Sequence, residues 1–453
     1  MKKGFLKKNV TENVKVKEKI NKEDLRLPKV DRLSVLPKVL LHHILSFLDI
    51  KEVLRTCILS RRWRYLWIDL HVLNIDDKFW LDINGEVKTD KFQTYVNKFL
   101  LQRDGSNIEK FSLIYENEKS GYVVDDYMDK IYTWVVSVVR RNVEDLHLQV
   151  QYMPPLFSFC YSTKLKTLRL TNATLPVQVE GSWCPPSLES LIIENCCHQY
   201  LEDINISALQ LKYLKVINKH DSIFVGPYQC ELKICAPNLT SLECIGYMYQ
   251  NYHLENLSSV VFARIDTKKY RDHNTKTFLV MALKNLFRGL VSTKSLLLSV
   301  EGIQTFADLQ TLFKPVVISF PNLKYLKLTE WRHDCFISTL AKLFEGFSCI
   351  ETLVMERMKV SYKPPKQEVH WGKQLVFNCM LHKLKSVRMQ NLKGCENELR
   401  FIEVLLEKAM VLEDIAITTT KEHTSDSEKK LEEFIKKLQS LPKASSSATI
   451  LCN

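Results

Sequence analysis

Residues 323–328 read LKYLKL, and close copies of this phrase recur along most of the chain. Each copy has a leucine or similar residue, two mostly polar residues, and then an apolar–any–apolar strand pattern. The clear copies are VEDLHL (143–148), LKTLRL (165–170), LESLII (188–193), LKYLKV (211–216), LTSLEC (239–244), LKYLKL (323–328), IETLVM (350–355) and LKSVRM (384–389). Weaker copies fall at 108–114, 257–262 and 294–299. The chain therefore contains one structural unit repeated many times.

The spacing of the copies, roughly 22 to 35 residues, is at and beyond the upper end of leucine-rich repeats. One short strand and its returning segment cannot bury their apolar sides alone, so neighbouring units must stack. We therefore expect an irregular leucine-rich-repeat horseshoe with a parallel sheet on its concave face. An ordinary α/β domain in which such phrases occur by chance is the alternative.

The irregular period predicts insertions, which we expect around residues 247–272 and 359–373, and such loops often carry binding specificity. The first of them holds a cluster of Tyr247, Tyr249, Tyr252 and His253. These side chains could contact a partner or fill a satellite core, and we prefer the core.

A second informative stretch is DRLSVLPKVLLHHILSFLDIKEVLRTCILSRRWRYLW at residues 31–67. Pro37 suits a first helical turn, and an apolar stripe at helical spacing runs from Leu40 to Leu48. Asp49 and Glu52 form a capping-box pattern for a second helix. Ser60 can cap a third helix that carries Trp63 and Trp67 on one face. So short a segment cannot bury all its apolar groups on itself, so the surplus must contact the rest of the chain or a partner.

This stretch resembles a plant F-box, on the evidence of residues 31–34 (DRLS), 36–37 (LP), 44–48 (ILSFL) and 59–67 (LSRRWRYLW). The resemblance implies docking to the Skp adaptor of cullin–RING ubiquitin ligases. The residues expected to contact the adaptor are Leu36, Pro37, Leu40, Ile44, Leu45, Leu48, Leu59, Ser60, Trp63, Leu66 and Trp67. Two positions depart from the family pattern, since Lys38 replaces an acidic residue and Asp49 replaces a proline. Without the resemblance, a three-helix piece of a larger core would explain the pattern equally well.

The pattern changes from about residue 364. We expect a strand at 384–389, a turn at Lys393-Gly394, a helix at 399–412, a strand at 412–417, a last helix capped by Ser425 and Glu428, and a final strand at 448–451. This arrangement resembles the FBD module of plant F-box/leucine-rich-repeat proteins. The matching residues are 384–385, Gly394, 398–399, 405–409 (LLEKA), 411–413 (VLE) and 441–446 (LPKASS).

The predicted fold is therefore α/β: an N-terminal three-helix F-box, an irregular leucine-rich-repeat solenoid, and a C-terminal α+β FBD-like module as its cap. We assign residues 1–30 to a basic, disordered tail, 31–70 to the F-box, 100–363 to the repeats and 364–453 to the FBD-like module.

The net charge of +12 comes partly from lysines in the first 22 residues. They are dispersed, which favours a solvated tail over a nucleic-acid or nuclear-import patch. No apolar run is long enough for a membrane span, and no signal peptide is evident. The 13 cysteines are scattered and indicate reduced thiols, hence the nucleus and/or the cytoplasm.

We find no Gly-rich phosphate loop, HExxH, GxSxG or CxxC motif. Cys196-Cys197-His198 is the nearest thing to a metal cluster, but it follows a repeat strand and has no second ligand pair, so we interpret the cysteines as core residues. We expect no metal, no cofactor and no catalytic centre.

The sequence thus predicts a non-catalytic substrate-recognition subunit of a Skp–cullin–F-box type ubiquitin ligase. The F-box would dock the adaptor, and the repeats would bind an unknown target protein for ubiquitination. A leucine-rich-repeat scaffold or receptor with a vestigial F-box and no ligase role is the alternative, supported by Lys38 and Asp49. The sequence does not identify the target or any co-ligand.

Overall fold

The computed structural model describes residues 33, 35–116, 124–153, 159, 162–175, 184–197, 201–219, 230–268, 276–299, 319–331, 344, 346–357, 381–419 and 425–452. The predicted basic tail, His198 and the insertion predicted at 359–373 lie outside these residues.

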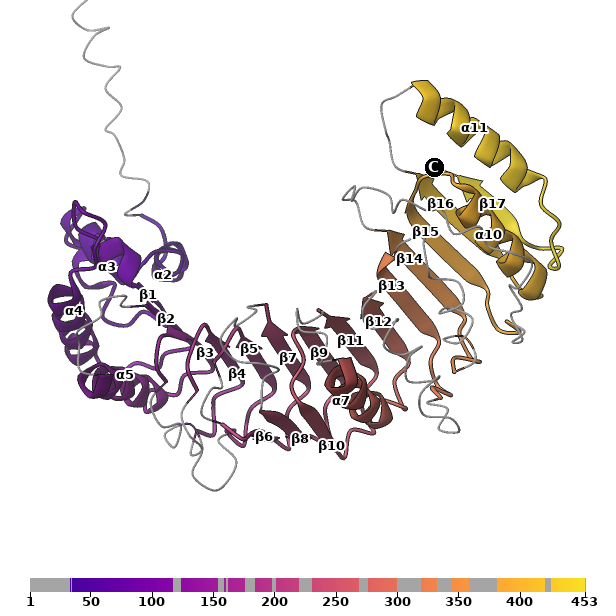
Figure 1. The fold of residues 1–453 in the computed structure, drawn as a ribbon. Coiled ribbons are helices and arrows are strands. Elements are labelled where there is room, and N and C mark those ends of the chain that lie inside the picture. The colour runs from indigo at the N-terminus through magenta and orange to yellow at the C-terminus, as the bar shows by residue number, and fades with distance from the viewer. Residues whose placement is uncertain are drawn as a thin grey trace, which may run out of the picture.

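One parallel sheet runs through nearly the whole chain and forms an open arc (Figure 1). Within the described residues it has fourteen strands: β1 (Val72–Asp76), β2 (Lys110–Tyr115), β3 (Asp145–Val150), β4 (Thr167–Thr171), β5 (Ser190–Glu194), β7 (Tyr213–Asn218), β9 (Ser241–Gly246), β11 (Phe262–Thr267), β12 (Ser295–Ser299), β13 (Tyr325–Trp331), β14 (Thr352–Arg357), β15 (Ser386–Leu392), β16 (Asp414–Thr419) and β17 (Thr449–Cys452). Every clear repeat phrase supplies one of these strands, which confirms the strand-rich, repeat-based body predicted above.

The helices flank this sheet at its N-terminal end and on its outer side (Figure 1). They are α2 (Lys38–Leu45), α3 (Ile50–Arg55), α4 (Thr89–Gln102), α5 (Val124–Val139), α7 (Lys276–Gly289), α10 (Glu396–Lys408) and α11 (Ser425–Gln439), with short 3-10 turns η1 (Thr56–Ile58), η2 (Trp63–Tyr65) and η3 (Asp77–Trp80).

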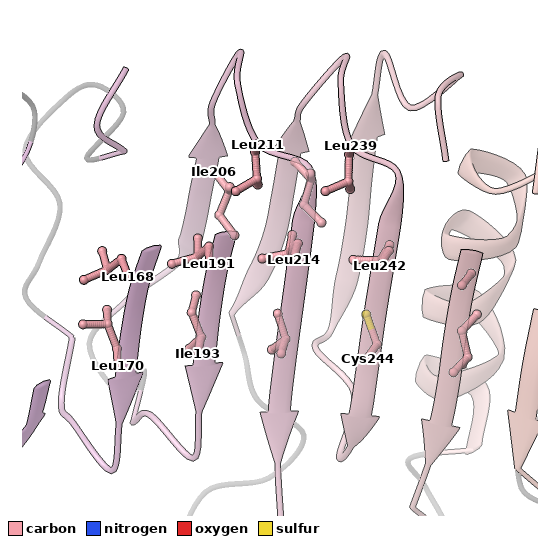
Figure 2. Close-up of a cluster of buried hydrophobic side chains, with 14 of the residues drawn as sticks. Leu168, Leu170, Leu191, Ile193, Ile206, Leu211, Leu214, Leu239, Leu242 and Cys244 are labelled. Atoms are coloured by element: carbon pink, nitrogen blue, oxygen red, sulfur yellow. The ribbon is translucent and has the colours of Figure 1, made fainter. Parts of the chain in front are cut away.

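A second, three-stranded parallel sheet covers the middle of the outer side, in the order β10 (Asn251–Glu255), β8 (Glu231–Cys235) and β6 (Asp203–Ser207). Apolar side chains of the two sheets meet in the core. Figure 2 shows Leu191 and Leu214 of the large sheet beside Ile206 of β6, and each is at most 1% exposed. The repeats are therefore held together by apolar residues that each unit shares with its neighbours.

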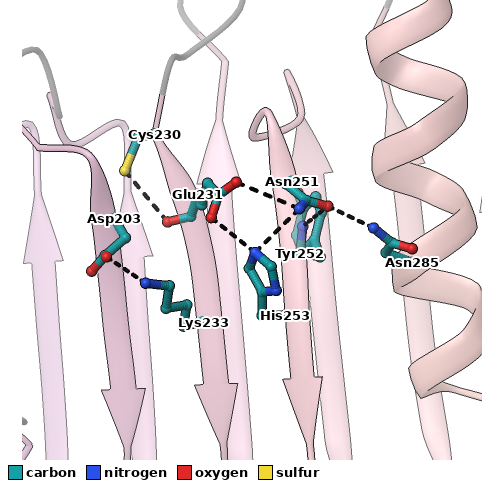
Figure 3. Close-up of polar contacts among 8 residues, drawn as sticks. All are labelled: Asp203, Cys230, Glu231, Lys233, Asn251, Tyr252, His253 and Asn285. Carbon is teal, nitrogen blue, oxygen red and sulfur yellow. Dashed lines mark hydrogen bonds and ion pairs between the residues drawn. The ribbon is translucent and has the colours of Figure 1, made fainter.

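The outer face of the small sheet is polar (Figure 3). Lys233 pairs with Asp203 at 2.6 Å, and His253 lies 2.8 Å from Glu231 on the neighbouring strand. The amide of Asn285 on α7 donates to Asn251 at 2.7 Å. Exposed ion pairs of this kind contribute little to stability. These contacts hold the neighbouring strands and α7 in alignment and do not drive folding.

The structure describes residues 247–268 of the predicted insertion at 247–272, and this part is not an insertion, because it carries β10 and β11 in regular succession. Residues 269–272 lie outside the described residues. Tyr249 and Tyr252 are 2% and 3% exposed and belong to the main core, while His253 is exposed on the outer face. Of the two interpretations of this aromatic cluster, the core one therefore holds for Tyr249 and Tyr252.

The predicted third N-terminal helix is not present as an α-helix. The chain forms the 3-10 turns η1 and η2 there, with Arg62 rather than Ser60 at the start of η2. The first helix also ends at Leu45, before Leu48, and Pro37 precedes it as its N-cap. Local apolar spacing does not distinguish a short 3-10 turn from a helical turn.

The C-terminal elements occur close to the predicted positions, and β15, β16 and β17 extend the large sheet instead of forming a separate one. A buried contact connects them to the repeats: Arg357 of β14 lies 3.0 Å from Glu398 of α10, whose side chain is fully buried. Glu398 also accepts hydrogen bonds from the N–H groups of Gly394 and Cys395, at 2.8 and 3.1 Å. That this segment is an FBD module stays a prediction.

Replacing Arg357 with alanine should leave the Glu398 carboxylate buried without its guanidinium. Breaking a buried ion pair in this way typically costs about 3–5 kcal/mol. We expect a clear fall in the urea midpoint of unfolding, followed by circular dichroism. The matched control is Arg388→Ala, since Arg388 is exposed on the neighbouring strand β15. Equal midpoints for the two variants would contradict the structural role of the pair.

Candidate functional site

The N-terminal helices have one buried side and one exposed side. Leu41, Leu45, Ile50, Val53, Trp63 and Leu66 are each at most 5% exposed and join the core of the chain. On the other side, large apolar side chains remain in solvent. We call this set the N-terminal apolar surface: Val35, Val39, Leu40, Ile44, Phe47, Ile58, Leu59 and Tyr65, which are 39% to 87% exposed. Exposed apolar groups gathered in one short segment indicate a binding surface.

The structure sorts the residues predicted to contact an adaptor into three groups. Exposed are Pro37, Leu40, Ile44 and Leu59; partly buried are Leu36, Leu48, Ser60 and Trp67; buried are Leu45, Trp63 and Leu66. The last group packs inside this chain and is not available at its surface. These three residues hold the segment together, and their contact with an adaptor stays a prediction.

Sequence reasoning missed Val35, Val39, Phe47, Ile58 and Tyr65, which are all exposed. An apolar stripe spread over more than half of a short helix does not indicate which half faces the core. The missing information was the position of the first strand, whose packing against the helices selects the buried half.

That strand, β1, connects the N-terminal helices to the large sheet. Asp49, at the start of α3, accepts a hydrogen bond from the Lys51 N–H at 2.8 Å and another from the Asp76 N–H of β1 at 2.9 Å. The Asn74 side chain of β1 donates to the Ser46 carbonyl at 2.8 Å. The predicted cap at Asp49 is thus confirmed, and the same carboxylate joins helix to sheet.

A second connection lies at the other end of the segment. The buried Arg103, just after α4, donates to the carbonyls of Trp67 and Leu70 at 3.1 and 2.5 Å. Burial lowers the pKa of Arg103 to about 10, so it still carries its charge at neutral pH. The Trp67 ring also lies 5.3 Å from the Phe99 ring of α4. The N-terminal segment is therefore fixed to the repeats at two places, one near its middle and one at its C-terminal end.

Lys38, one of the two departures from the family pattern, forms an ion pair with Asp69. His42 Nε2 lies 3.3 Å from the other oxygen of the same carboxylate. Burial lowers the pKa of His42, with Asp69 opposing the shift, so this histidine is mainly neutral at pH 7. The Asp69 carboxylate of the same chain therefore neutralises the positive charge of Lys38.

The thiol predicted to be a core residue, Cys196, is 2% exposed, and burial raises its pKa to about 12. It is a protonated thiol packed among apolar groups. Across the part of the chain that the structure describes, no three His, Cys, Asp or Glu side chains gather in a group that could hold a metal ion. No helix of that part is long and apolar enough to cross a membrane.

Comparison with known proteins bears on the same segment. Residues 33–74 match the model of the F-box domain, a range that includes α2, α3, η1, η2 and the start of β1. An F-box/LRR-repeat protein of Arabidopsis thaliana is 27% identical, with 92% of this chain and 86% of the relative covered. A putative F-box/FBD/LRR-repeat protein of the same plant is 24% identical over 93% of this chain and 94% of the relative. A putative FBD-associated F-box protein of Arabidopsis thaliana is 23% identical over 85% of this chain and 94% of the relative. The resemblance to plant F-box/FBD/leucine-rich-repeat proteins is thereby confirmed over most of the chain.

A pH effect is expected at the junction, because Asp77 at the start of η3 is buried and accepts the Glu116 N–H at 2.9 Å. Burial raises its pKa from 3.8 to about 6. Between these two values the folded chain holds a proton that the unfolded chain releases, so this group adds stability as the pH falls from 6 towards 4. Asp77→Asn should flatten this part of the stability profile and not destabilise the protein at pH 7.5. Thermal melts across the range test this, and an unchanged profile would contradict it.

Proposed function

We propose that this F-box protein is the substrate-recognition subunit of a Skp–cullin–F-box type ubiquitin ligase. The observation that carries the proposal is the coincidence of two findings. The segment that matches the F-box domain, residues 33–74, is also the one that exposes the N-terminal apolar surface. A Skp-type adaptor would cover this surface, with Leu40, Ile44 and Leu59 among its contacts.

The proposed mechanism is positional. The chain would bind a target protein through its repeats and hold it near a ubiquitin-charged enzyme, so its contribution is proximity rather than chemistry. A fixed distance between the adaptor and the target supports such a role. The hydrogen bonds of Asp49 and Arg103 with the neighbouring elements favour a rigid connection between the F-box and the sheet. We further propose that the chain is not itself an enzyme and that it acts in the nucleus or the cytoplasm.

The alternative, a repeat scaffold with a vestigial F-box, drew its support from Lys38 and Asp49. Asp49 acts as a helix cap and a tie to β1, so it replaces the family proline without loss of local structure. Lys38 pairs with Asp69. Both departures are compatible with a functional F-box. A reconstituted ligase separates the two functions, because adaptor binding without transfer of ubiquitin to a bound target would favour the scaffold.

The direct test of docking is the double variant Leu40→Ala/Leu59→Ala, titrated against a plant Skp-type adaptor by calorimetry. Both side chains are exposed, at 47% and 59%, so their loss should leave the fold intact. Truncating an interface hot spot costs about 2 kcal/mol, which corresponds to an affinity roughly 30-fold lower for each hot spot removed.

The matched control is Leu101→Ala, since Leu101 is 82% exposed at the end of α4, outside the F-box. It should bind the adaptor like the wild type. Equal affinities for the double variant and the control would exclude the N-terminal apolar surface as the docking site.

A further inference from the structure

The edge of the large sheet at which the strands begin carries a row of charges. The residue that comes second in each repeat phrase lies here, and from residue 144 its sign alternates over four repeats: Glu144, Lys166, Glu189 and Lys212. Lys166 pairs with Glu144 at 2.6 Å, and Lys212 pairs with Glu189 at 2.8 Å. The backbone follows the same order, because the Lys166 N–H donates to the Glu144 carbonyl and the Glu189 N–H to the Lys166 carbonyl. This edge therefore neutralises its own charges.

The alternation stops in the middle of the chain. The next three residues of the row are Thr240, Val261 and Lys294, and Val261 is 43% exposed. The N–H of Lys294 donates to the Val261 carbonyl, and the N–H of Lys324 donates to the Lys294 carbonyl, so these residues are direct neighbours. Lys324 pairs with Glu351 at 2.9 Å. Within the described residues, the exposed Lys294 has no carboxylate partner.

The inner face of the sheet changes character at the same strands. In register across β11, β12 and β13 stand Phe262, Ser295 and Tyr325. Two residues further along each strand stand Arg264, Leu297 and Lys327. All six face away from the core, because the residues between them, such as Ala263, Leu296 and Leu326, are buried.

In β3, β4 and β5, at the N-terminal end of the arc, the corresponding positions are polar except for Ile192 of β5. Asp145 of β3 and Thr167 of β4 are register partners, and Ser190 of β5 pairs with Thr167. The contrast matters because aromatic and leucine side chains left on an open sheet face do not help the fold. Local departures of this kind, without a structural gain, are expected at functional positions.

Charge on these strands is unbalanced. In β11 to β13 and the residue before each strand, the sequence has four cations and two carboxylates: Arg264, Lys294, Lys324 and Lys327 against Asp266 and Glu330. Arg264 pairs with Asp266 at 3.1 Å, and Lys327 pairs with Glu356 of β14 at 2.9 Å. Lys294 is thus left with a positive charge beside apolar neighbours, which suits a carboxylate supplied from outside.

We propose that the β11–β13 surface, defined as Val261, Phe262, Lys294, Leu297 and Tyr325, binds an acidic segment of the target protein that also carries apolar side chains. Phe262, Leu297 and Tyr325 contact the apolar groups, and Lys294 pairs with a carboxylate. Aromatic anchors next to a charge of one sign are typical of binding hot spots, in which apolar burial gives affinity and the charge gives orientation. This inference deepens the proposed function and rests on it for the identity of the occupant as a ligase target.

The test selects peptides from a displayed library of short random sequences on the immobilised full-length chain. The enriched peptides are then synthesised, labelled and titrated by fluorescence polarisation. We expect them to combine Asp or Glu with Leu, Phe or Trp. Lys294→Glu and Tyr325→Ala should each weaken binding roughly tenfold or more. The control Lys98→Glu makes the same charge change at an exposed lysine of α4 and should bind like the wild type.

Two results with peptides would overturn the inference. One is the enrichment of basic peptides or of none, and the other is binding that Lys294→Glu and Tyr325→Ala leave unchanged. Stronger capture of single-stranded nucleic acid than of any peptide, lost in Lys294→Glu, would assign the surface to a different partner and also count against it. Titrating the adaptor against the same preparations distinguishes failure of this inference from failure of the proposed function. Adaptor binding without peptide binding rejects only the surface, whereas peptide binding without adaptor binding rejects the ligase role.

Discussion

Parallel pairing of one short strand from each repeat is the constraint on which the rest of this structure depends. A single unit buries its inward leucines only when a neighbour covers them, so Leu168, Leu191 and Leu214 lie in one continuous core (Figure 2). The turns that join strands are adapted to this stacking. At Gly246, with φ of +95°, a Cβ atom would lie 2.0 Å from the Asn218 carbonyl oxygen of the preceding strand, so only glycine fits there.

The same constraint extends to both ends of the chain. The N-terminal helices reach the sheet through β1, where the backbone and the Asp49 side chain make the contact. The C-terminal elements reach it through β15, reinforced by the buried pair of Arg357 and Glu398. Each end is thus a continuation of the stack and not a module joined by a loop. This continuity lets the F-box hold a fixed position relative to the inner face of the repeats.

Much of the fold could be predicted because the repeat phrase states both the strand and its buried face. The phrase also fits residues 70–75 (LHVLNI), so β1 could have been predicted in the same way. Leu201-Glu-Asp-Ile-Asn-Ile206 fits it too, yet it forms β6 of the outer sheet. The phrase specifies alternation along a strand but not which sheet the strand joins, because that depends on the length and packing of the returning segment.

The candidate site was predicted less completely than the fold. The segment was located correctly, but its buried and exposed halves were mixed, since Leu45 and Trp63 are needed inside while Phe47 and Ile58 stay outside. The β11–β13 surface was missed because its signal is a break in a charge pattern. That break becomes visible only when the strands are set in register.

We propose that this chain joins a Skp-type adaptor through its N-terminal segment while its repeats remain folded and free to bind a target. The most direct measurement mixes the full-length chain with a purified plant Skp-type adaptor and determines the mass of the product by size-exclusion chromatography with light scattering. We expect a stable complex of one chain with one adaptor. Separate elution of the two proteins at micromolar concentration, with the repeats shown to be folded by circular dichroism, would contradict it.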